Sequence, residues 1–295
     1  VVIRLIPGAV FSDSMRKPPR RFPEAYVQEI RKQIEEMLRL GVISEAAEDI
    51  QSQVLLVRKK DGSLRFCIDY RALNALTIPE RWPIPHIRDL LARLKGKRVF
   101  GVLDLSQGYW QLELHPDSRR LTTFTTTFGT FQFNRVPFGL RNAPSAFQFA
   151  MARRVLNGLV GNCCEIYIDD IIVFGVDQQE FENNLDKVLQ RLEERRIVVK
   201  PSKCRLGLSE VEYVGLKVDG DSIRVTTERQ EVIRAILLPE TVTQLRSFLG
   251  LINYVRDFIP LFAEHAAPLY ELLKGKVKKT EPINWTTIAR KKFDL

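Results

Sequence analysis

The sequence predicts an α+β protein, in which a mixed body of strands and helices precedes a small helical region. Runs rich in β-branched and aromatic residues, such as 99–105 and 166–174, are typical of strands. Elsewhere apolar residues recur at helical spacing, as in 27–38 and 181–192. From about residue 226 onward the pattern is helical throughout, so the strands belong to the earlier part of the chain.

Length and composition are typical of a soluble globular protein with several subdomains. The chain has 295 residues, 45% of them apolar, and a formal net charge of +9. This charge favours a polyanionic partner, either nucleic acid or an anionic membrane surface. No apolar stretch approaches the roughly 20 residues of a membrane-spanning helix, and no secretory signal is present. Because the chain begins with Val rather than Met, we expect it to be a piece of a longer product.

The cysteines and histidines indicate an intracellular protein without zinc. Cys67, Cys163, Cys164 and Cys204 show no C-x-x-C spacing and have no nearby histidine partner in the sequence. We expect them to be reduced, buried thiols. The histidines are scattered along the chain and support no metal cluster.

The first part of the chain is predicted to contain an extended arm, a helix and a β-hairpin. Residues 1–23 are rich in proline and form the arm. A helix over 27–38 follows, and Gly41 lies where a C-terminal cap belongs. Two apolar runs, 54–57 and 64–68, flank a D-G turn, which predicts two antiparallel strands.

The middle of the chain is predicted to alternate between helices and strands. A helix over 87–94 ends at Gly96, and an almost continuous apolar strand covers 99–105. Another helix follows Pro144.

Two capping boxes predict helix starts in the second half. Asp177 and Glu180 precede one apolar helical pattern, and Thr241 and Gln244 precede another. Between them, residues 213–218 resemble a strand that is followed by a D-G turn.

Two adjacent carboxylates, Asp169 and Asp170, interrupt an apolar run and are the first sign of a site. Ionised carboxylates are costly to bury unless they are paired or hold a metal. Side by side at a hairpin they repel each other, and a divalent cation would relieve the repulsion. The alternative is an Asx turn, in which Asp bonds its own backbone; for an isolated pair this is the commoner case.

Asp104 repeats the pattern, because it is a carboxylate inside another apolar strand. If the two strands are neighbours in one sheet, three carboxylates converge. Hard divalent cations prefer oxygen ligands, and Mg²⁺ takes carboxylates together with substrate phosphates. Convergent carboxylates and a basic groove suggest a two-metal phosphoryl-transfer site.

Six segments, in order and covering nearly the whole chain, resemble reverse transcriptases. More narrowly, they are similar to the reverse transcriptase domain of gypsy-type (Metaviridae) LTR retrotransposon Pol polyproteins. The segments are VRKKDGSLRFCIDYRALN (57–74), VFGVLDLSQGYWQLEL (99–114), FGTFQFNRVPFGLRNAPSAFQ (128–148), IYIDDIIVFG (166–175), KPSKCRL (200–206) and LRSFLGLINYVRDFIP (245–260).

The resemblance implies a right-hand polymerase fold of fingers, palm and thumb, with an antiparallel palm sheet and a helical C-terminal thumb. The implied parts are an N-terminal arm (1–23), fingers (24–98), palm (99–125), a fingers/palm loop (126–145), palm with primer grip (146–222), thumb (223–275) and the start of a linker toward a ribonuclease H domain (276–295).

The resemblance also implies an RNA-directed DNA polymerase, which extends a primer 3′-hydroxyl with dNTPs on RNA or DNA templates for retrotransposon replication. Asp104, Asp169 and Asp170 match the catalytic carboxylates, which hold two Mg²⁺ ions, with Mn²⁺ as a substitute. The implied dNTP-binding residues are Lys59, Arg65, Tyr109, Phe138, Gly139 and Gln148. The implied primer grip is Tyr213, Val214, Gly215 and Leu216.

Individual roles follow from the same resemblance. Lys59 and Arg65 would clamp the triphosphate; without the resemblance they would be read as a solvated hairpin face. Tyr109 would stack under the deoxyribose and exclude a 2′-hydroxyl, and Ile168 would lie beneath the primer end. Gln148, on the helix behind the Phe138 loop, would support the nucleotide site.

The implied partners are an RNA/DNA template-primer duplex, dNTPs and the rest of the Pol polyprotein, namely protease, ribonuclease H and integrase. The implied location is a cytoplasmic virus-like particle, with no membrane partner. Two alternatives stay open. One is a domesticated or decayed nucleic-acid-binding module without turnover, and the other is a viral enzyme rather than a retrotransposon enzyme.

Overall fold

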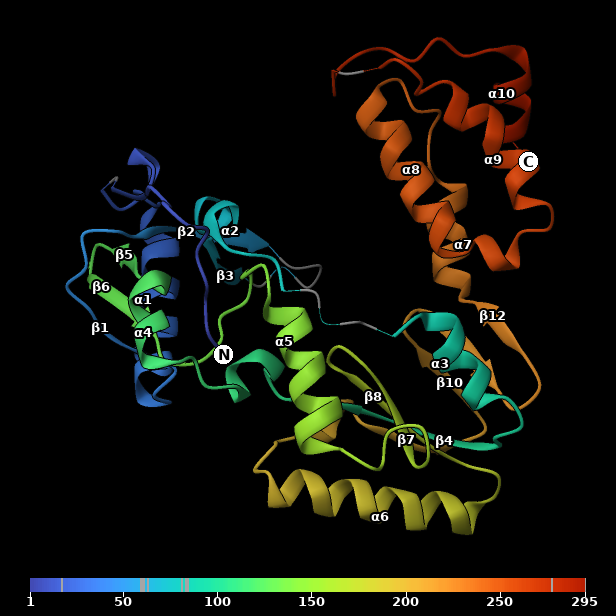
Figure 1. Cartoon of the computed structure of the whole chain (residues 1–295), viewed down its shortest axis with the longest axis horizontal. Helices are drawn as coiled ribbons and strands as arrows, with labels where there is room; N and C mark the ends of the chain where they lie inside the picture. The colour runs from blue at the N-terminus through green and yellow to red at the C-terminus, as the bar shows by residue number, and fades with distance from the viewer. Residues whose placement is uncertain are drawn as a thin grey trace. The chain divides into compact units, whose positions relative to one another are not determined.

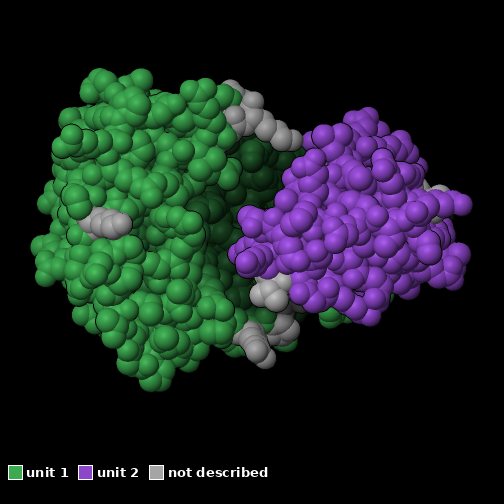
Figure 2. All heavy atoms as spheres, turned by 90° about the horizontal axis from the view of Figure 1, so that it is seen from above, with its two compact units in different colours: residues 1–208 green, residues 209–295 purple. Residues whose placement is uncertain are grey.

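The predicted α+β class is confirmed by the structure, a computed structural model that describes all residues except 17, 59–61, 63, 81, 83–84, 277 and 295 (Figure 1). The chain divides into two compact units, Val1–Leu208 and Ser209–Leu295, which are coloured separately in Figure 2. The division falls before the segment implied as primer grip. The finer limits of fingers, palm and thumb stay predictions.

The first unit contains a five-stranded sheet in the order β1-β6-β5-β2-β3. All neighbouring strands are antiparallel except β2 and β5, which are parallel. The strands are β1 (Ile43–Glu45), β2 (Ser52–Arg58), β3 (Leu64–Asp69), β5 (Phe124–Thr126) and β6 (Gly129–Phe133), and the helices of this region are α1 (Glu24–Arg39), α2 (Arg71–Leu76) and α4 (Pro116–Arg119).

Helix α1 confirms the first predicted helix and its end. Its buried side chains Ile30, Ile34 and Met37 share one face and join the core of the five-stranded sheet. Gly41 has a φ of +66°, and its N–H donates to the Leu38 carbonyl at 2.9 Å. This left-handed glycine ends the helix in a Schellman-type motif, as the sequence predicted.

The β2–β3 hairpin is also confirmed, with six residue pairs that include Val57 with Arg65. Residues 59–61 and 63 of its turn lie outside the described residues. In the described part of the arm over 1–23, a short 3₁₀ turn covers Asp13–Arg16, and another turn lies at Pro7 and Gly8, where Gly8 has a φ of +70°. The N-terminal amine donates to the Glu113 carbonyl at 2.6 Å, and the Ile6 N–H donates to the Leu76 carbonyl at 2.9 Å.

A second, four-stranded sheet of this unit runs in the order β7-β8-β4-β9, with every neighbour antiparallel. Helix α6 runs alongside this sheet (Figure 1). The strands of this sheet are β4 (Val99–Asp104), β7 (Cys164–Tyr167), β8 (Asp170–Gly175) and β9 (Arg205–Leu208). The helices of this region are α3 (Ile87–Leu94), α5 (Ala143–Phe149) and α6 (Gln178–Glu194). Helix α5 continues into a π-helical turn, Ala150–Val155.

Helix α6 packs closely on the four-stranded sheet. Phe181 and Val188 of α6 are buried with Ile171 of β8 in one apolar cluster. A Cβ on Gly175 would collide with the Phe181 backbone, so only glycine permits this approach. Asp177 caps the helix, as predicted, by accepting the Glu180 N–H at 2.8 Å. The predicted capping box is only half formed, because the Glu180 side chain accepts from the Val176 N–H and not from the Asp177 N–H.

The second unit combines a small sheet with a group of helices. The sheet order is β10-β11-β12, and both pairs are antiparallel. The elements are β10 (Glu210–Tyr213), β11 (Leu216–Asp219), β12 (Ile223–Val225), α7 (Thr227–Arg234), α8 (Val242–Tyr254), α9 (Phe262–Glu271) and α10 (Thr287–Phe293). The predicted capping box of Thr241 and Gln244 is confirmed at the start of α8.

The prediction of a single strand over 213–218 is wrong. Val214 and Gly215 have φ values of +52° and +70°, so the chain reverses there and continues as β11. Apolar residues on both sides of a two-residue turn gave the appearance of one strand, because V-G lacks the polar residue common in such turns.

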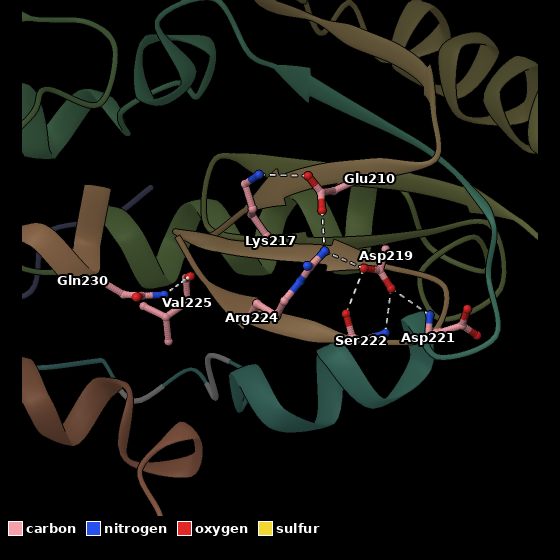
Figure 3. Close-up of polar contacts among 8 residues, drawn as sticks. All are labelled: Glu210, Lys217, Asp219, Asp221, Ser222, Arg224, Val225 and Gln230. Carbon is pink, nitrogen blue, oxygen red and sulfur yellow. Dashed lines mark hydrogen bonds and ion pairs between the residues drawn. The ribbon is translucent and has the colours of Figure 1, made fainter. Parts of the chain in front are cut away.

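Ion pairs connect the strands of the small sheet (Figure 3). Glu210 of β10 contacts Lys217 at 2.9 Å and Arg224 at 2.6 Å. Arg224 also contacts Asp219 at 2.8 Å. Asp219 accepts hydrogen bonds from Ser222, and these bonds hold the pKa of its carboxyl below its usual range. All three strands are thereby tied together near the β11–β12 turn.

Candidate active site

The three carboxylates predicted from the sequence come together at one end of the four-stranded sheet. Asp104 is the last residue of β4 and Asp170 the first of β8, and the two are directly paired in the antiparallel register. Asp169 precedes Asp170 in the β7–β8 turn. The prediction that the two acidic strands are neighbours is therefore confirmed.

The carboxylates influence one another electrostatically. The pKa of Asp170 is raised to about 6, first by burial and then by the charges of Asp169 and Asp104, while the charge of Lys203 acts in the opposite direction. Mutual repulsion of this kind favours binding of positive charge. The site thus has an excess of negative charge that a cation would neutralise.

The donor set fits a hard divalent cation, because it consists of carboxylate oxygens. Among the described residues, no three His, Cys, Asp or Glu side chains form a ready-made ligand cage. Mg²⁺ usually completes its coordination with water and substrate phosphates, so a carboxylate group open to solvent suits it. Asp169 has an exposed side chain, and Asp104 and Asp170 are half-buried.

Lys203 is a charged neighbour that the sequence reasoning did not single out. Its Nζ lies 3.2 Å from Oδ2 of Asp104. The Lys200 N–H donates to the Asp104 carbonyl at 2.8 Å, which places the 3₁₀ turn Pro201–Lys203 beside the carboxylates. The motif over 200–206 was part of the resemblance and was the available signal for this residue.

The β7–β8 turn has two central residues, because Tyr167 pairs with Asp170. Ile168 has a φ of +58°, a conformation that is strained for a β-branched residue. Its N–H donates to Oε1 of Gln148 at 2.5 Å, and Nε2 of Gln148 donates to the Ile166 carbonyl at 3.1 Å. Gln148, only 3% exposed, therefore holds the backbone of the β7–β8 turn.

This placement specifies the supporting position expected for Gln148. The oxygen and the nitrogen of its side-chain amide both form hydrogen bonds with the β7–β8 hairpin and do not project to solvent. Its contribution to nucleotide binding stays a prediction. The signal available in the sequence was its place in the 128–148 motif, but its bonding partners, 18 and 20 residues away, were not visible.

Tyr109 lies beside the carboxylates, in the 3₁₀ turn Gly108–Gln111 that follows β4. Its ring centre is 5.1 Å from that of Phe138 and 5.4 Å from that of Phe147. Burial, followed by the charge of Asp169, raises the pKa of Tyr109 to about 12. The phenol is therefore neutral and packed among aromatic rings next to the acidic turn.

The other residues predicted to bind the nucleotide differ in how closely they contact Tyr109 and the carboxylates. Phe138 is 47% exposed and contacts the Tyr109 ring. Gly139 has a φ of +93°, and its carbonyl accepts from Nδ2 of Asn74 at 2.8 Å. Arg65 is exposed on β3, the edge strand of the other sheet. Lys59 lies outside the described residues.

The implied primer grip belongs to the second unit. Tyr213 and Leu216 are buried at the ends of β10 and β11, and Val214 and Gly215 form the turn between them. Its position relative to the carboxylates stays a prediction.

Three carboxylates at the end of an antiparallel sheet are the arrangement expected of a polymerase with a right-hand fold. The reverse transcriptase (RNA-dependent DNA polymerase) family matches residues 57–218, more than half of the chain. The chain belongs to this family. The reverse transcriptase resemblance read from the sequence is thereby confirmed.

Relatives with transposon names support the narrower resemblance to gypsy-type elements. The retrovirus-related Pol polyprotein from transposon 297 of Drosophila melanogaster is 35% identical over 266 residues, 88% of this chain and 25% of that protein. The one from transposon gypsy, also of Drosophila melanogaster, is 34% identical over 277 residues, 90% of this chain and 27% of that protein. The chain thus spans about a quarter of the length of these relatives.

A solved structure supports the fold. The foamy viral protease-reverse transcriptase in complex with double-stranded DNA has a TM-score of 0.82 and 27% sequence identity, covering 95% of this chain and 49% of that one. The right-hand polymerase fold is therefore confirmed. Among the described residues, no helix has the length and apolar character needed to cross a membrane.

Proposed function

We propose that this chain is an RNA-directed DNA polymerase that extends a primer 3′-hydroxyl with dNTPs on RNA or DNA templates. The observation that carries the proposal is the direct pairing of Asp104 with Asp170, next to Asp169 in the turn. Family membership supports the reaction, and the net charge of +9 suits a nucleic-acid duplex.

Asp104, Asp169 and Asp170 would hold two Mg²⁺ ions, for which Mn²⁺ could substitute. Bound there, the ions would lower the pKa of the primer hydroxyl and neutralise charge on the triphosphate. The chain's own contribution is to hold the carboxylates in place. Gln148 does so through the backbone of the turn, and the β4–β8 pairing does so for the other strand.

The nucleotide would be bound by side chains around the carboxylates. Tyr109 would stack under the deoxyribose and exclude a ribose 2′-hydroxyl, with Phe138 and Gly139 forming the adjoining wall. Arg65 and Lys59 would bind the triphosphate, since guanidinium and ammonium groups pair well with phosphate oxygens. Ile168 would lie beneath the primer end, and 213–216 would grip the primer backbone.

The biological setting is proposed from the relatives. Because they are Pol polyproteins of transposons, we propose retrotransposon replication as the process served. The partners would be a template-primer duplex and the protease, ribonuclease H and integrase of the same polyprotein. The location would be a cytoplasmic virus-like particle.

Primer extension tests the proposal. The full chain is incubated with poly(rA)/oligo(dT), labelled dTTP and Mg²⁺, and incorporation is compared with that of Asp169→Asn. Asp186→Asn is the matched control, because it makes the same chemical change at an exposed position of α6. We expect Mg²⁺-dependent incorporation by the parent chain and by the control, and almost none by Asp169→Asn.

Two results would count against the polymerase. No incorporation by a folded parent chain would do so, and binding of the duplex without turnover would then support the binding-module alternative. Equal incorporation by the parent chain and Asp169→Asn would exclude the carboxylates as the reactive centre.

A further inference from the structure

The β10–β11 turn adopts a conformation that its sequence disfavours. Tyr213 pairs with Leu216, which leaves Val214 and Gly215 as the two central residues. Their φ values are +52° and +70°. Positive φ at both positions is the pattern of a type I′ turn, in which Asn-Gly is preferred and a β-branched residue is strained. Something outside the turn must therefore stabilise it.

Tyr254, the last residue of α8, supplies one such contact. Its hydroxyl donates a hydrogen bond to the Val214 carbonyl, with 2.5 Å between the oxygens. In a β-turn the bonded carbonyl belongs to the first residue, here Tyr213. The Val214 carbonyl consequently needs another donor, and a half-buried carbonyl without one would be unfavourable.

Arg229 of α7 supplies a second contact. Its guanidinium carbon lies 4.3 Å from the centre of the Tyr254 ring, within the range of a cation–π interaction. A Cβ built on Gly215 would lie 2.9 Å from Cζ and Nη2 of Arg229. The guanidinium thus packs against both the tyrosine and the turn backbone, and leaves no room for a side chain at position 215.

Arg229 occupies a place in which its positive charge is unfavourable for the stability of the folded unit. Thr226 caps α7, so Arg229 lies in the first turn, where the helix dipole disfavours positive charge. Its Nη1 is buried and makes no hydrogen bond with the part of the chain that the structure describes. Locally unfavourable features that persist at one place point to a functional constraint.

The other end of the same hairpin is fixed independently. The ion pairs of Glu210 with Lys217 and Arg224 tie the strands together at a distance from the turn (Figure 3). Loss of the contacts from α7 and α8 is therefore expected to loosen the turn without separating the strands. This separation of roles makes the turn contacts testable.

We propose that Tyr254 and Arg229 are positioning residues that act together to hold the Val214-Gly215 turn in the conformation that receives the primer end. Only the statement that the turn receives the primer end rests on the proposed function. Holding the turn is a property of this unit, and it can be measured without any reaction.

The first measurement is amide hydrogen exchange in the full chain, followed by mass spectrometry of peptides that cover 210–219. Tyr254→Phe removes only the hydroxyl, and Arg229→Gln removes the charge. We expect exchange in the turn to be roughly three- to tenfold faster in each variant, the effect of losing one hydrogen bond. Tyr270→Phe on α9 and Arg234→Gln on α7 change exposed residues and should leave exchange unchanged.

The second measurement is primer extension, with kcat normalised to the concentration of template-primer binding sites so that unfolded protein does not contribute. We expect kcat to fall roughly three- to tenfold in Tyr254→Phe while the KM for dNTP stays within about twofold, because the primer and not the nucleotide is displaced. The double variant should lose less than the product of the two single losses, since both side chains hold one turn.

The outcomes separate the inference from the polymerase proposal. Unchanged exchange in both variants would overturn the positioning of the turn. Faster exchange with unchanged kcat would overturn its role in placing the primer. An inactive parent chain in which the variants still exchange faster would count against the polymerase proposal and would leave the turn contacts supported.

Discussion

The turns between β7 and β8 and between β10 and β11 are built alike. Each has two central residues, and each places a β-branched residue, Ile168 or Val214, at positive φ. Each is also bonded through its backbone by one helical side chain, Gln148 of α5 in the first turn and Tyr254 of α8 in the second. They differ in the charge around them.

That difference indicates what each turn is for. The first turn contains Asp169 and is followed by Asp170, and its backbone is held by the neutral amide of Gln148. Lys203 offsets only part of the negative charge of the carboxylates, because the pKa of Asp170 is still raised. The second turn contains no charged residue and packs against the guanidinium of Arg229. The first turn, which we propose binds cations, is thus supported by a neutral side chain that does not compete with them. The second turn, which we propose contacts the primer backbone, is supported by a cationic side chain.

The largest expected effect is that of Asp170→Asn. Removing one carboxylate from the group should lower the rate of nucleotide incorporation by about 10³-fold, since metal stabilisation of transition-state charge is worth several kcal/mol. Single-turnover extension with saturating template-primer measures this rate. A loss of less than tenfold would mean that the first turn is not the reactive one.

Gln148→Leu is expected to have the next largest effect. The change leaves the Ile168 N–H and the Ile166 carbonyl without their partners, which should destabilise the first unit by about 2 to 4 kcal/mol. Urea unfolding of the full chain measures the stability, and extension by the remaining folded protein should also fall. Gln190→Leu, an exposed residue of α6, is the control and should change neither.

The raised pKa of Asp170 predicts a pH dependence that the second turn lacks. A carboxyl with a folded pKa of about 6 and an unfolded value of 3.8 binds more protons when folded between these values. Without metal, stability should therefore decrease as pH rises from 3.8 to 6, by about 1 to 2 kcal/mol after allowance for solvent screening. Asp170→Asn should flatten this part of the profile measured in EDTA.

Addition of Mg²⁺ should restore the folding stability that the repulsion between the carboxylates removes at neutral pH. Stability at pH 7 is expected to rise with Mg²⁺ concentration in the parent chain, because an ion that binds only the folded state stabilises it. Thermal unfolding with and without Mg²⁺ measures this shift. The same shift in Asp170→Asn would show that the ion binds elsewhere.

Asparagine substitutions compare the two strained positions directly and should have the smallest effect on stability. Asn tolerates the left-handed region, so Ile168→Asn and Val214→Asn should each relieve backbone strain of about 1 kcal/mol. Val214→Asn should keep its activity because only the backbone of that residue is used. Ile168→Asn should lose activity, since its side chain is proposed to lie under the primer end; equal activities would remove the distinction.

Much of the site could be predicted from the sequence because its key residues stand out locally. A carboxylate within an apolar strand is unusual, and Asp104 and Asp170 each interrupt such a run. The helix end at Gly41 and the cap at Asp177 were visible for a similar reason, since each depends on residues a few positions away. These predictions are confirmed.

The supporting contacts could not be predicted, because they join distant residues. Lys203 is 99 residues from Asp104, and Tyr254 is 40 residues from Val214. No local pattern records which side chain a folded helix brings to a turn. The prediction of a single strand over 213–218 was wrong for a related reason. Contacts from α7 and α8 stabilise a turn that the V-G sequence alone does not predict.

We have proposed that carboxylates from two distant segments hold the same ions, and cleavage by a bound metal tests this most directly. Iron(II) substituted for Mg²⁺, with ascorbate and peroxide, generates hydroxyl radicals that cut the backbone beside the bound metal. We expect cuts near 104 and near 169, both suppressed by excess Mg²⁺ and both lost in Asp170→Asn. Cuts at only one segment, or cuts that persist in the variant, would contradict it.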